Sequence, residues 1–175
     1  LEEHPDAHVH IFNSCSASAG EVLLALKVRD LAAAGHPFHE VVSQATAFCG
    51  GMNTLFVLET LENLRKNGRL TGLQSVVTAA LRIKLLMGST PQGEICKRGQ
   101  AMSMKQALGK MVEIMEKDPN HVGKLLVLSH CNCLERAFQL KEMVRKSCRF
   151  SEVFICETGG ISTVYANDGG IVAAY

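Results

Sequence analysis

The stretch Thr54-Leu-Phe-Val-Leu-Glu-Thr-Leu-Glu-Asn-Leu-Arg-Lys-Asn-Gly-Arg-Leu-Thr-Gly72 indicates most clearly how this chain folds. Its first five residues are apolar and partly β-branched or aromatic, which is typical of a buried strand. Leucines then recur at helical spacing, so the pattern predicts a strand that leads directly into a short helix. Arg65 and Lys66 lie where that helix would end, beside its exposed carbonyl groups, and Asn67-Gly68 tolerates the left-handed backbone of a helix stop.

Arg69 directly follows this predicted helix stop. The pattern Thr71-x-x-Gln74 is a capping box, and it predicts a second helix with Leu73, Val77 and Leu81 on its apolar face. We therefore expect Arg69 on a short turn between two helices, a fixed position from which a long cation can meet an anion or a partner protein. The alternative is an ordinary solvated cation at a helix end.

The overall composition is that of a globular chain with a real apolar core. It has 175 residues, of which 47% are hydrophobic, and a formal net charge of +1. Lysine and arginine are spread along the chain and balanced by acidic residues, which argues against a nucleic-acid-binding protein. No apolar run reaches membrane-spanning length, and no signal peptide is recognisable at the first residues, so we expect no integral membrane association.

Seven cysteines are an odd number, and they are scattered through apolar segments: Cys15, Cys49, Cys96, Cys131, Cys133, Cys148 and Cys156. Such a distribution favours reduced, mostly buried thiols over a disulfide framework. Reduced thiols are typical of a reducing compartment, and the cytoplasm is therefore the expected location.

The remaining chain alternates between predicted helices and strands. Capping patterns at Ser18, Ser103 and Asn132 predict helices behind them, and a further helix is expected over residues 39–48. Apolar runs predict further strands over residues 8–12, 83–87, 94–96, 125–128, 153–156, 162–165 and 171–175, and the turn-rich residues 89–93 predict a hairpin. We therefore expect an α/β (mixed α+β) fold, a single domain over residues 1–175 with helices packed on a central mixed sheet.

Two groups of residues are candidates for chemistry. Ser14 lies where a predicted strand ends before a helix, a position that often faces ligands in α/β folds, although a turn or capping serine is the ordinary alternative. Cys131 and Cys133 follow His130, but a lone Cys-x-Cys without a second ligand pair is a weak indication of a metal site or a reactive thiol. Small residues at a strand-to-helix junction explain them equally well, and we expect no bound metal.

The pattern around Arg69 also resembles a known family. The residues Leu58-Glu-x-Leu-x-x-Leu-Arg-Lys-x-Gly-Arg69-Leu-x-Gly-x-Gln74, followed by Leu81-Arg-Ile-Lys84-Leu-Leu and Gly93-Glu-Ile95, are similar to the DegV family of fatty-acid-binding proteins. The similarity extends to Phe12-Asn-Ser14, at the family's strand-ending Asp-Ser, and to Tyr165-Ala-Asn-Asp-Gly-Gly170. It spans essentially the whole chain.

This resemblance implies a binding protein without catalysis of its own and without a cofactor. A long-chain fatty acid lies in an apolar tunnel of such proteins, and hydroxyl groups near the interface of two lobes hold its carboxylate. The loaded protein presents that carboxylate to a separate kinase related to dihydroxyacetone kinases. The resemblance also implies that this chain is the carboxyl-terminal portion, with an amino-terminal lobe absent from it.

The family's binding residues carry over only in part. The threonine and serine that hold the carboxylate would lie upstream of Leu1, and the family's histidine falls on Tyr165, whose phenol can still donate a hydrogen bond. Tyr165, with Ser14 and Arg69, is therefore the expected carboxylate site. An arginine linked to kinase docking falls on Met102, which makes Arg69 and the nearby Arg98 the candidates for docking.

Two other kinds of function remain open from the sequence. One is an enzyme that uses the thiols of Cys131 and Cys133, or a metal bound by them. The other is a regulatory α/β interaction module that has lost lipid binding, an alternative suggested by Met102 and Tyr165. It predicts a closed packing of the lobes without a tunnel. We also expect residues 1–175 alone to bind a fatty acid weakly or not at all, because the upstream hydroxyl groups are absent from them.

Overall fold

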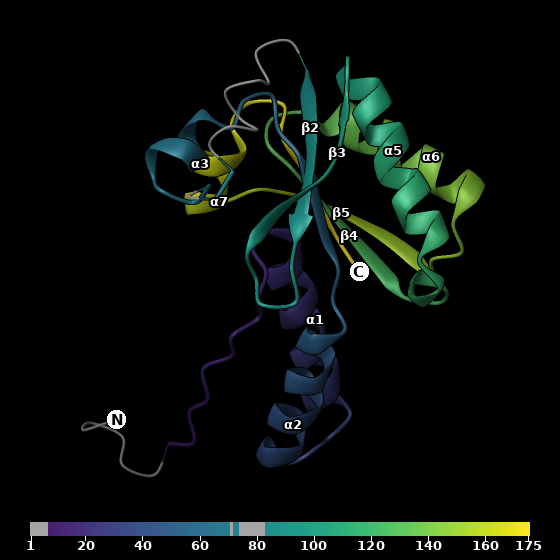
Figure 1. Ribbon diagram of the computed structural model, residues 1–175. Coiled ribbons are helices and arrows are strands. Elements are labelled where there is room, and N and C mark those ends of the chain that lie inside the picture. Colours follow the sequence, from purple (N-terminus) through teal and green to yellow (C-terminus); the bar gives the residue numbers. More distant parts are fainter. Residues whose placement is uncertain (1–6, 71, 74–82) are drawn as a thin grey trace.

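The computed structural model describes residues 7–70, 72–73 and 83–175 (Figure 1). The strands are β1 (Thr54–Val57), β2 (Lys84–Ser89), β3 (Ile95–Ala101), β4 (Leu125–His130), β5 (Glu152–Glu157) and β6 (Ile171–Ala174). The helices are α1 (Ala19–Ala33), α2 (Phe38–Gly50), α3 (Glu62–Lys66), α5 (Met104–Lys117), α6 (Leu134–Ser147) and α7 (Gly160–Ala166), with one 3₁₀ turn, η1 (Pro119–His121).

These strands form one sheet in the order β3-β2-β1-β6-β4-β5. Only β4 and β5 run parallel, and α6 provides the crossover that a parallel pair requires. All the other neighbouring strands are antiparallel, including the hairpin of β2 and β3 around the turn at residues 90–94. The expected α/β fold with a central mixed sheet is thus confirmed.

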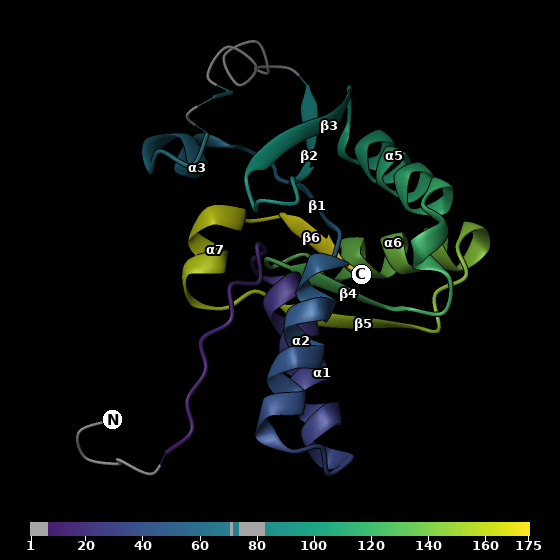
Figure 2. The ribbon, with the colours of Figure 1, turned by 60° about the horizontal axis from the view of Figure 1, so that its bottom comes forward.

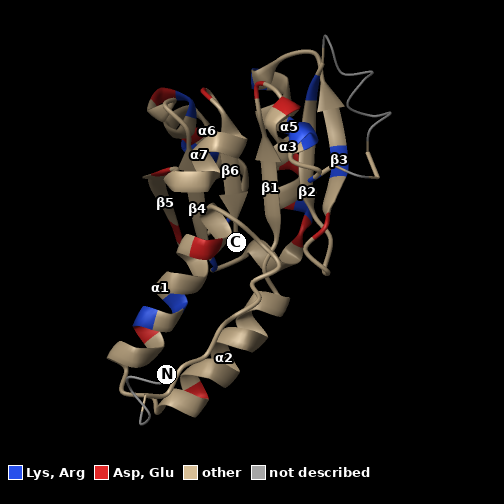
Figure 3. Ribbon diagram, turned by 90° about the vertical axis from the view of Figure 1, so that its left-hand side faces the viewer, with Lys and Arg blue, Asp and Glu red and all other residues tan. Residues whose placement is uncertain are grey.

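Helices cover both faces of the sheet (Figure 2). On one face, α5 and α6 bury the main core, which includes Leu55, Leu86 and Leu128. On the other face, α1 packs on β4 and β6 through Leu23 and Val127. Helices α3 and α7 lie on this same face. The paired α1 and α2 extend beyond the sheet (Figure 3). No helix of the described ranges is long and apolar enough to cross a membrane.

Residues 54–70 fold as their local pattern predicts. Strand β1 is buried, α3 follows it, and Gly68 has the left-handed φ of 68° that the helix stop requires. The N–H of Arg69 donates to the carbonyl of Leu64 at 2.8 Å, so the turn carrying Arg69 is tied to α3. The second helix, predicted to begin at Thr71, lies outside the described residues except for positions 72 and 73.

Two strand predictions are wrong. Residues 8–12 have no regular secondary structure, and Ile11 is 88% exposed. A strand needs hydrogen-bonding neighbours, and no strand of the described part of the chain pairs with this segment. Residues 162–165 belong to α7 instead. In the sheet β4 lies between β5 and β6, so the connection from β5 to β6 passes over β4, and α7 is part of this connection. The β-branched residues of this segment therefore have no neighbouring strand with which to pair.

The helices predicted behind Ser18, Ser103 and Asn132 are confirmed, but only one of these three side chains caps its helix. Ser103 does cap α5, since its Oγ accepts the N–H of Gln106 at 3.3 Å. Ser18 stands at the N-cap position of α1, but its side chain accepts no hydrogen bond from the helix. The N-cap position of α6 is held by Cys133 and not by Asn132, which has a positive φ of 51°. Sequence spacing alone does not decide which way a serine or asparagine side chain turns.

Glu59, between β1 and α3, joins three parts of the fold. Its carboxylate binds the ammonium group of Lys84 and lies 2.9 Å from the Nη2 of Arg136, whose Nη1 donates to the carbonyl of Gly169. Burial raises the pKa of Glu59, but the hydrogen bonds and charges of the two cations outweigh it, so its pKa lies below the ordinary value. This network fixes β2 and α6 against the turn before β6.

Candidate functional site

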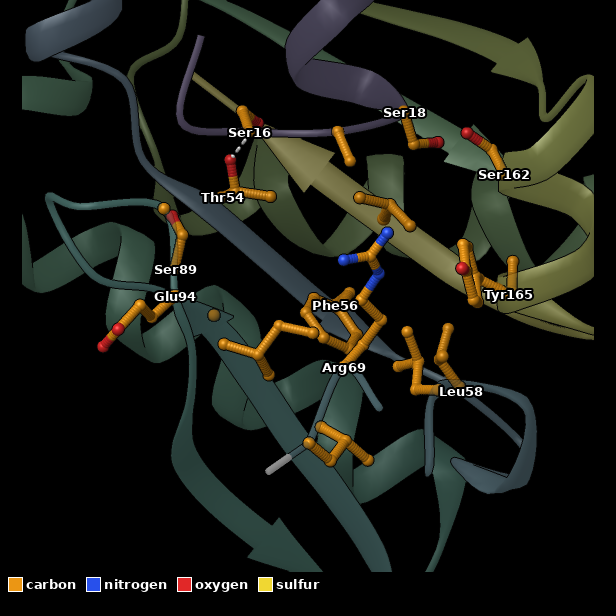
Figure 4. A pocket seen from close by; sticks show the side chains of 18 of the residues that line it. Ser16, Ser18, Thr54, Phe56, Leu58, Arg69, Ser89, Glu94, Ser162 and Tyr165 are labelled. Carbon is orange, nitrogen blue, oxygen red and sulfur yellow. Dashed lines mark hydrogen bonds between the residues drawn. The ribbon is translucent and has the colours of Figure 1, made fainter. Parts of the chain in front are cut away.

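A cavity of about 850 Å³ lies on the face of the sheet that carries α1, α3 and α7 (Figure 4). Its floor is formed by β1 and β6, through Phe56 and Val172. The turn after α3, the start of α1, the α7 helix and the β2–β3 hairpin surround this floor. Segments that are distant in the sequence therefore meet at one cavity.

Much of the cavity wall is apolar. Leu58, Leu64 and Leu70 are buried and belong to one cluster with Ala166 of α7, and Leu73 packs against it. This cluster is built by the helical leucine spacing of the opening stretch, which turns these side chains toward the sheet. The wall is thus suited to the apolar part of a ligand.

Hydroxyl groups gather at the opposite edge, beside the start of α1. Ser16 Oγ lies 2.6 Å from Thr54 Oγ1, and this pair joins the segment before α1 to the first residue of β1 (Figure 4). Gly20 permits this arrangement, because a Cβ at that position would lie 1.9 Å from Ser16 Oγ. Ser18, Ser89 and Ser162 also line the cavity.

Arg69 projects its guanidinium into the cavity, toward β6 and the start of α1 (Figure 4). Within the described ranges this group forms no hydrogen bond and no ion pair, although the side chain is solvent-exposed. Glu94 lines the same cavity but points away from the guanidinium. A cation that faces apolar walls and hydroxyl groups without a carboxylate partner is suited to an anionic ligand group.

Tyr165 is the second of the expected site residues that lines the cavity. It lies on α7, is half-buried, and packs against the apolar cluster that contains Ala166. The structure therefore brings Arg69 and Tyr165, which are 96 positions apart in the sequence, to one cavity.

Ser14 does not line the cavity. Its Oγ donates to Glu21 Oε1 at 2.5 Å and accepts the N–H of Ser16 at 3.1 Å. Both partners lie within seven positions in the sequence, so Ser14 has the geometry of the turn serine that was the ordinary alternative for it. It supports the segment that carries Ser16.

Arg98 does not line the cavity either. Its side chain lies over Gly88, where an added Cβ would be 3.0 Å from Arg98 Cγ. Gly88 pairs with Leu55, and paired residues of antiparallel strands share a face, which here is the face covered by α5. Arg69 and Arg98, the two candidates for docking, therefore lie on opposite faces of the sheet.

The two neighbouring thiols lie in the short segment between β4 and α6, with Cys131 in the apolar cluster that contains Ala166 and Cys133 against the main core. Cys131 is buried, and Cys133 Sγ lies 3.5 Å from the carbonyl oxygen of Gly170. Burial raises the pKa of the Cys133 thiol, which lowers the thiolate fraction that nucleophilic chemistry needs. Among the described residues, no group of three histidine, cysteine or acidic side chains could hold a metal ion.

Sequence patterns did not predict most of the hydroxyl groups of the cavity, namely those of Ser16, Ser18, Thr54, Ser89 and Ser162. One signal was available for the first two, because Ser14-x-Ser16-x-Ser18-x-Gly20 places small residues in alternation directly before a helix start. No comparable signal marks the other three. They reach the cavity only because β1, β2 and α7 surround it.

Comparison with known proteins agrees with this architecture. The family model described as "Uncharacterised protein, DegV family" matches residues 1–175. The DegV domain-containing protein spr0652 of Streptococcus pneumoniae (strain ATCC BAA-255 / R6) is 32% identical over 179 residues, which cover 100% of this chain and 62% of that protein. The chain thus spans less than two thirds of the length of this relative.

Two solved structures are similar over almost the whole chain. A DegV-family protein of Ruminococcus gnavus ATCC 29149, with vaccenic acid, is 47% identical with a TM-score of 0.92, and the match covers 99% of this chain and 62% of that one. The Streptococcus pneumoniae Fatty Acid Kinase (Fak) B3 protein, loaded with linoleic acid, is 31% identical with a TM-score of 0.88, over 100% of this chain and 62% of that one. Sequence and fold together lead to one conclusion: this chain belongs to the DegV family.

Proposed function

We propose that this chain forms part of a fatty-acid-binding protein and that the cavity beside α7 holds the ligand. The observation that carries the proposal is the pairing of an apolar wall with a guanidinium, that of Arg69, which has no partner among the described residues. A fatty acid has the same two parts, an apolar chain and one anionic group. The vaccenic and linoleic acids of the two similar structures support this choice of ligand.

The acyl chain supplies the affinity in this proposal. Each methylene removed from water contributes about 0.8 kcal/mol, so ten buried methylenes contribute roughly 8 kcal/mol before the entropy of binding is subtracted. The leucines of the cavity wall, together with Phe56, form the surface against which these methylenes pack.

The carboxylate decides the selectivity, because an anion enclosed by apolar surface needs hydrogen-bond donors. Arg69 offers charged donors, and the Tyr165 phenol offers a neutral one at the side of α7. The hydroxyl groups beside α1 lie on the same cavity. We place the head group among these residues and the tail along the leucine cluster.

A kinase partner follows from the same proposal. Fak B3 carries fatty acid kinase in its name, and we infer that this chain, like it, serves a kinase of the dihydroxyacetone-kinase type in the cytoplasm. The chain itself then performs no catalysis, and it needs no cofactor. Because Arg69 and Arg98 lie on opposite faces of the sheet, Arg69 at the cavity is the better candidate for a contact near the presented carboxylate.

The two alternatives have less support. An interaction module without lipid binding predicts closed packing of two lobes without a tunnel, and the partly apolar cavity of about 850 Å³ in this lobe favours a lipid-binding protein instead. A thiol enzyme needs an activated cysteine, and the burial of Cys133 works against activation.

Native mass spectrometry tests the proposal directly. The protein, produced with all the sequence that its gene encodes, is purified without detergent and examined for a bound acyl ligand. It is then delipidated and titrated with oleate. We expect a co-purified fatty acid, or tight uptake of oleate. A protein that carries no acyl ligand and takes none up contradicts the proposed function.

A further inference from the structure

Ser18 has a backbone conformation that its sequence position does not explain. Its φ of 55° and ψ of −110° lie in a region that L-residues other than glycine rarely adopt. Glycine would adopt this conformation without strain. Backbone strain of this kind is concentrated at functional sites, so a strained serine at a cavity points to a role of its side chain.

Local structure does not supply that reason. Serine at a helix N-cap normally accepts an N–H of the first turn, as Ser103 does for α5. Ser18 accepts none from α1, and its Oγ is buried without a hydrogen-bond partner. It is the one such side-chain atom in the described part of the molecule. Buried polar atoms are almost always hydrogen-bonded, so this hydroxyl is available to a partner other than the described residues.

The surroundings of Ser18 indicate which partner. Ser18 lines the cavity next to the hydroxyl pair of Ser16 and Thr54, which already satisfy each other at 2.6 Å. The guanidinium of Arg69 extends toward the same end of the cavity (Figure 4). Ser18 also stands at the amino terminus of the 15-residue helix α1, where the helix dipole favours negative charge. The guanidinium and the helix terminus therefore both favour an anion at this point.

We propose that Ser18 is a head-group ligand of the cavity: its hydroxyl donates a hydrogen bond to the ionised carboxylate of the bound amphiphile, opposite Arg69. The inference rests on the proposed function and adds a specificity-determining residue to it. In Figure 4 the hydroxyl points toward that of Ser162, which also lines the cavity, so the proposed hydrogen bond requires the Ser18 side chain to rotate about its Cα–Cβ bond. A neutral head group of the same size gains less from this hydrogen bond, so Ser18 selects the acid.

Two substitutions of Ser18 test this role, with oleate and oleyl alcohol as ligands of equal chain length. In Ser18→Ala the hydroxyl is removed, and in Ser18→Gly the hydroxyl and the backbone strain are both removed. We expect each variant to bind oleate roughly tenfold more weakly, the usual effect of losing one hydrogen bond to a charged group. Affinity for oleyl alcohol should change less than threefold. Ser18→Gly should unfold at the same or a higher denaturant concentration than the natural protein, because glycine suits φ 55°.

Ser103→Gly is the matched control, because it removes a serine from a helix start on the other face of the sheet. It should lose stability and keep its affinity for oleate. If the natural protein binds oleate and both Ser18 variants bind it equally well, the inference is wrong while the proposed function stands. An equal loss of affinity for oleate and oleyl alcohol also overturns it, since that indicates a change in cavity shape. If the natural protein binds neither ligand, the proposed function fails first.

Discussion

Replacing Arg69 by methionine removes the guanidinium from the cavity while keeping an unbranched apolar stem. Because that group forms no ion pair or hydrogen bond within the described ranges and is exposed, the free energy of unfolding should change by less than about 0.5 kcal/mol. Affinity for a fatty acid should fall, because the carboxylate loses a charged donor. The change thus separates a binding residue from a structural one.

The size of this loss follows from the position of Arg69. Two unit charges at 4 Å attract each other by about 4 kcal/mol at an effective dielectric constant of 20, which is an upper bound for a site near the surface. A hydrogen bond to a charged group contributes about 1.5–3 kcal/mol, and the exposure of Arg69 favours the lower end of that range. We therefore expect a loss of about 1.5–2 kcal/mol, or a roughly tenfold to thirtyfold weaker affinity for oleate.

This effect is measured by the displacement of a fluorescently labelled fatty acid from the delipidated protein. The competing ligands are oleate and oleyl alcohol, each at low and at high salt. The loss should be specific to oleate and should shrink at high salt, where exposed charges are screened. Arg98→Met is the matched control, since Arg98 lies on the other face of the sheet and should leave both affinities unchanged. Unchanged oleate affinity in Arg69→Met, or an equal loss with the alcohol, would refute the assignment of the head group to this end of the cavity.

Two further predictions concern the sheet and its pH dependence. Gly88→Ala should destabilise the fold by about 1–3 kcal/mol in chemical denaturation, because the new Cβ would lie 2.9 Å from the backbone oxygen of Thr54. The control is Gly99→Ala, where the atom nearest to the new Cβ is a side-chain atom at 3.8 Å, and it should change the free energy of unfolding by less than half as much. Equal effects of the two substitutions would contradict this reasoning. Since the pKa of Glu59 is lowered in the folded state, its ion pairs stabilise the fold above the ordinary pKa of 4.5, and this contribution is lost as the pH falls through the lowered value. At about pH 7, Glu59→Gln should therefore be less stable than the natural protein by about 1 kcal/mol or less, and at about pH 3 the two should be equally stable. A stability difference that stays constant across this range would show that the charge of Glu59 is not responsible.

Sequence patterns predicted the elements that depend on near neighbours. The strand, short helix and glycine stop before Arg69 follow from apolar spacing and from the left-handed backbone of Gly68, both of which act within a few positions. The hairpin of β2 and β3 and the capped helix α5 follow in the same way. The prediction for residues 8–12 failed because alternation indicates a strand only where another strand supplies its hydrogen bonds.

The site was predicted less completely than the fold. Arg69 and Tyr165 do line one cavity, but Tyr165 lies on a helix, whereas the β-branched residues beside it had predicted a strand. Ser14, expected in the site, is held by Glu21, and the hydroxyl group without a partner belongs to Ser18, four positions later. Side-chain directions of this kind depend on the backbone angles of single residues, which spacing does not reveal.

The sequence by itself determined the local run from Thr54 to Arg69, the alternation of helices and strands, and the resemblance to the DegV family. These rest on interactions between residues a few positions apart and on the order of motifs along the chain. The tertiary structure alone decided which polar groups share the cavity. Ser16 and Thr54 are 38 positions apart yet form one hydrogen bond, and the turn after α3 meets α1 and α7 across the sheet. A binding cavity forms between distant segments, so its composition is settled only when they pack together.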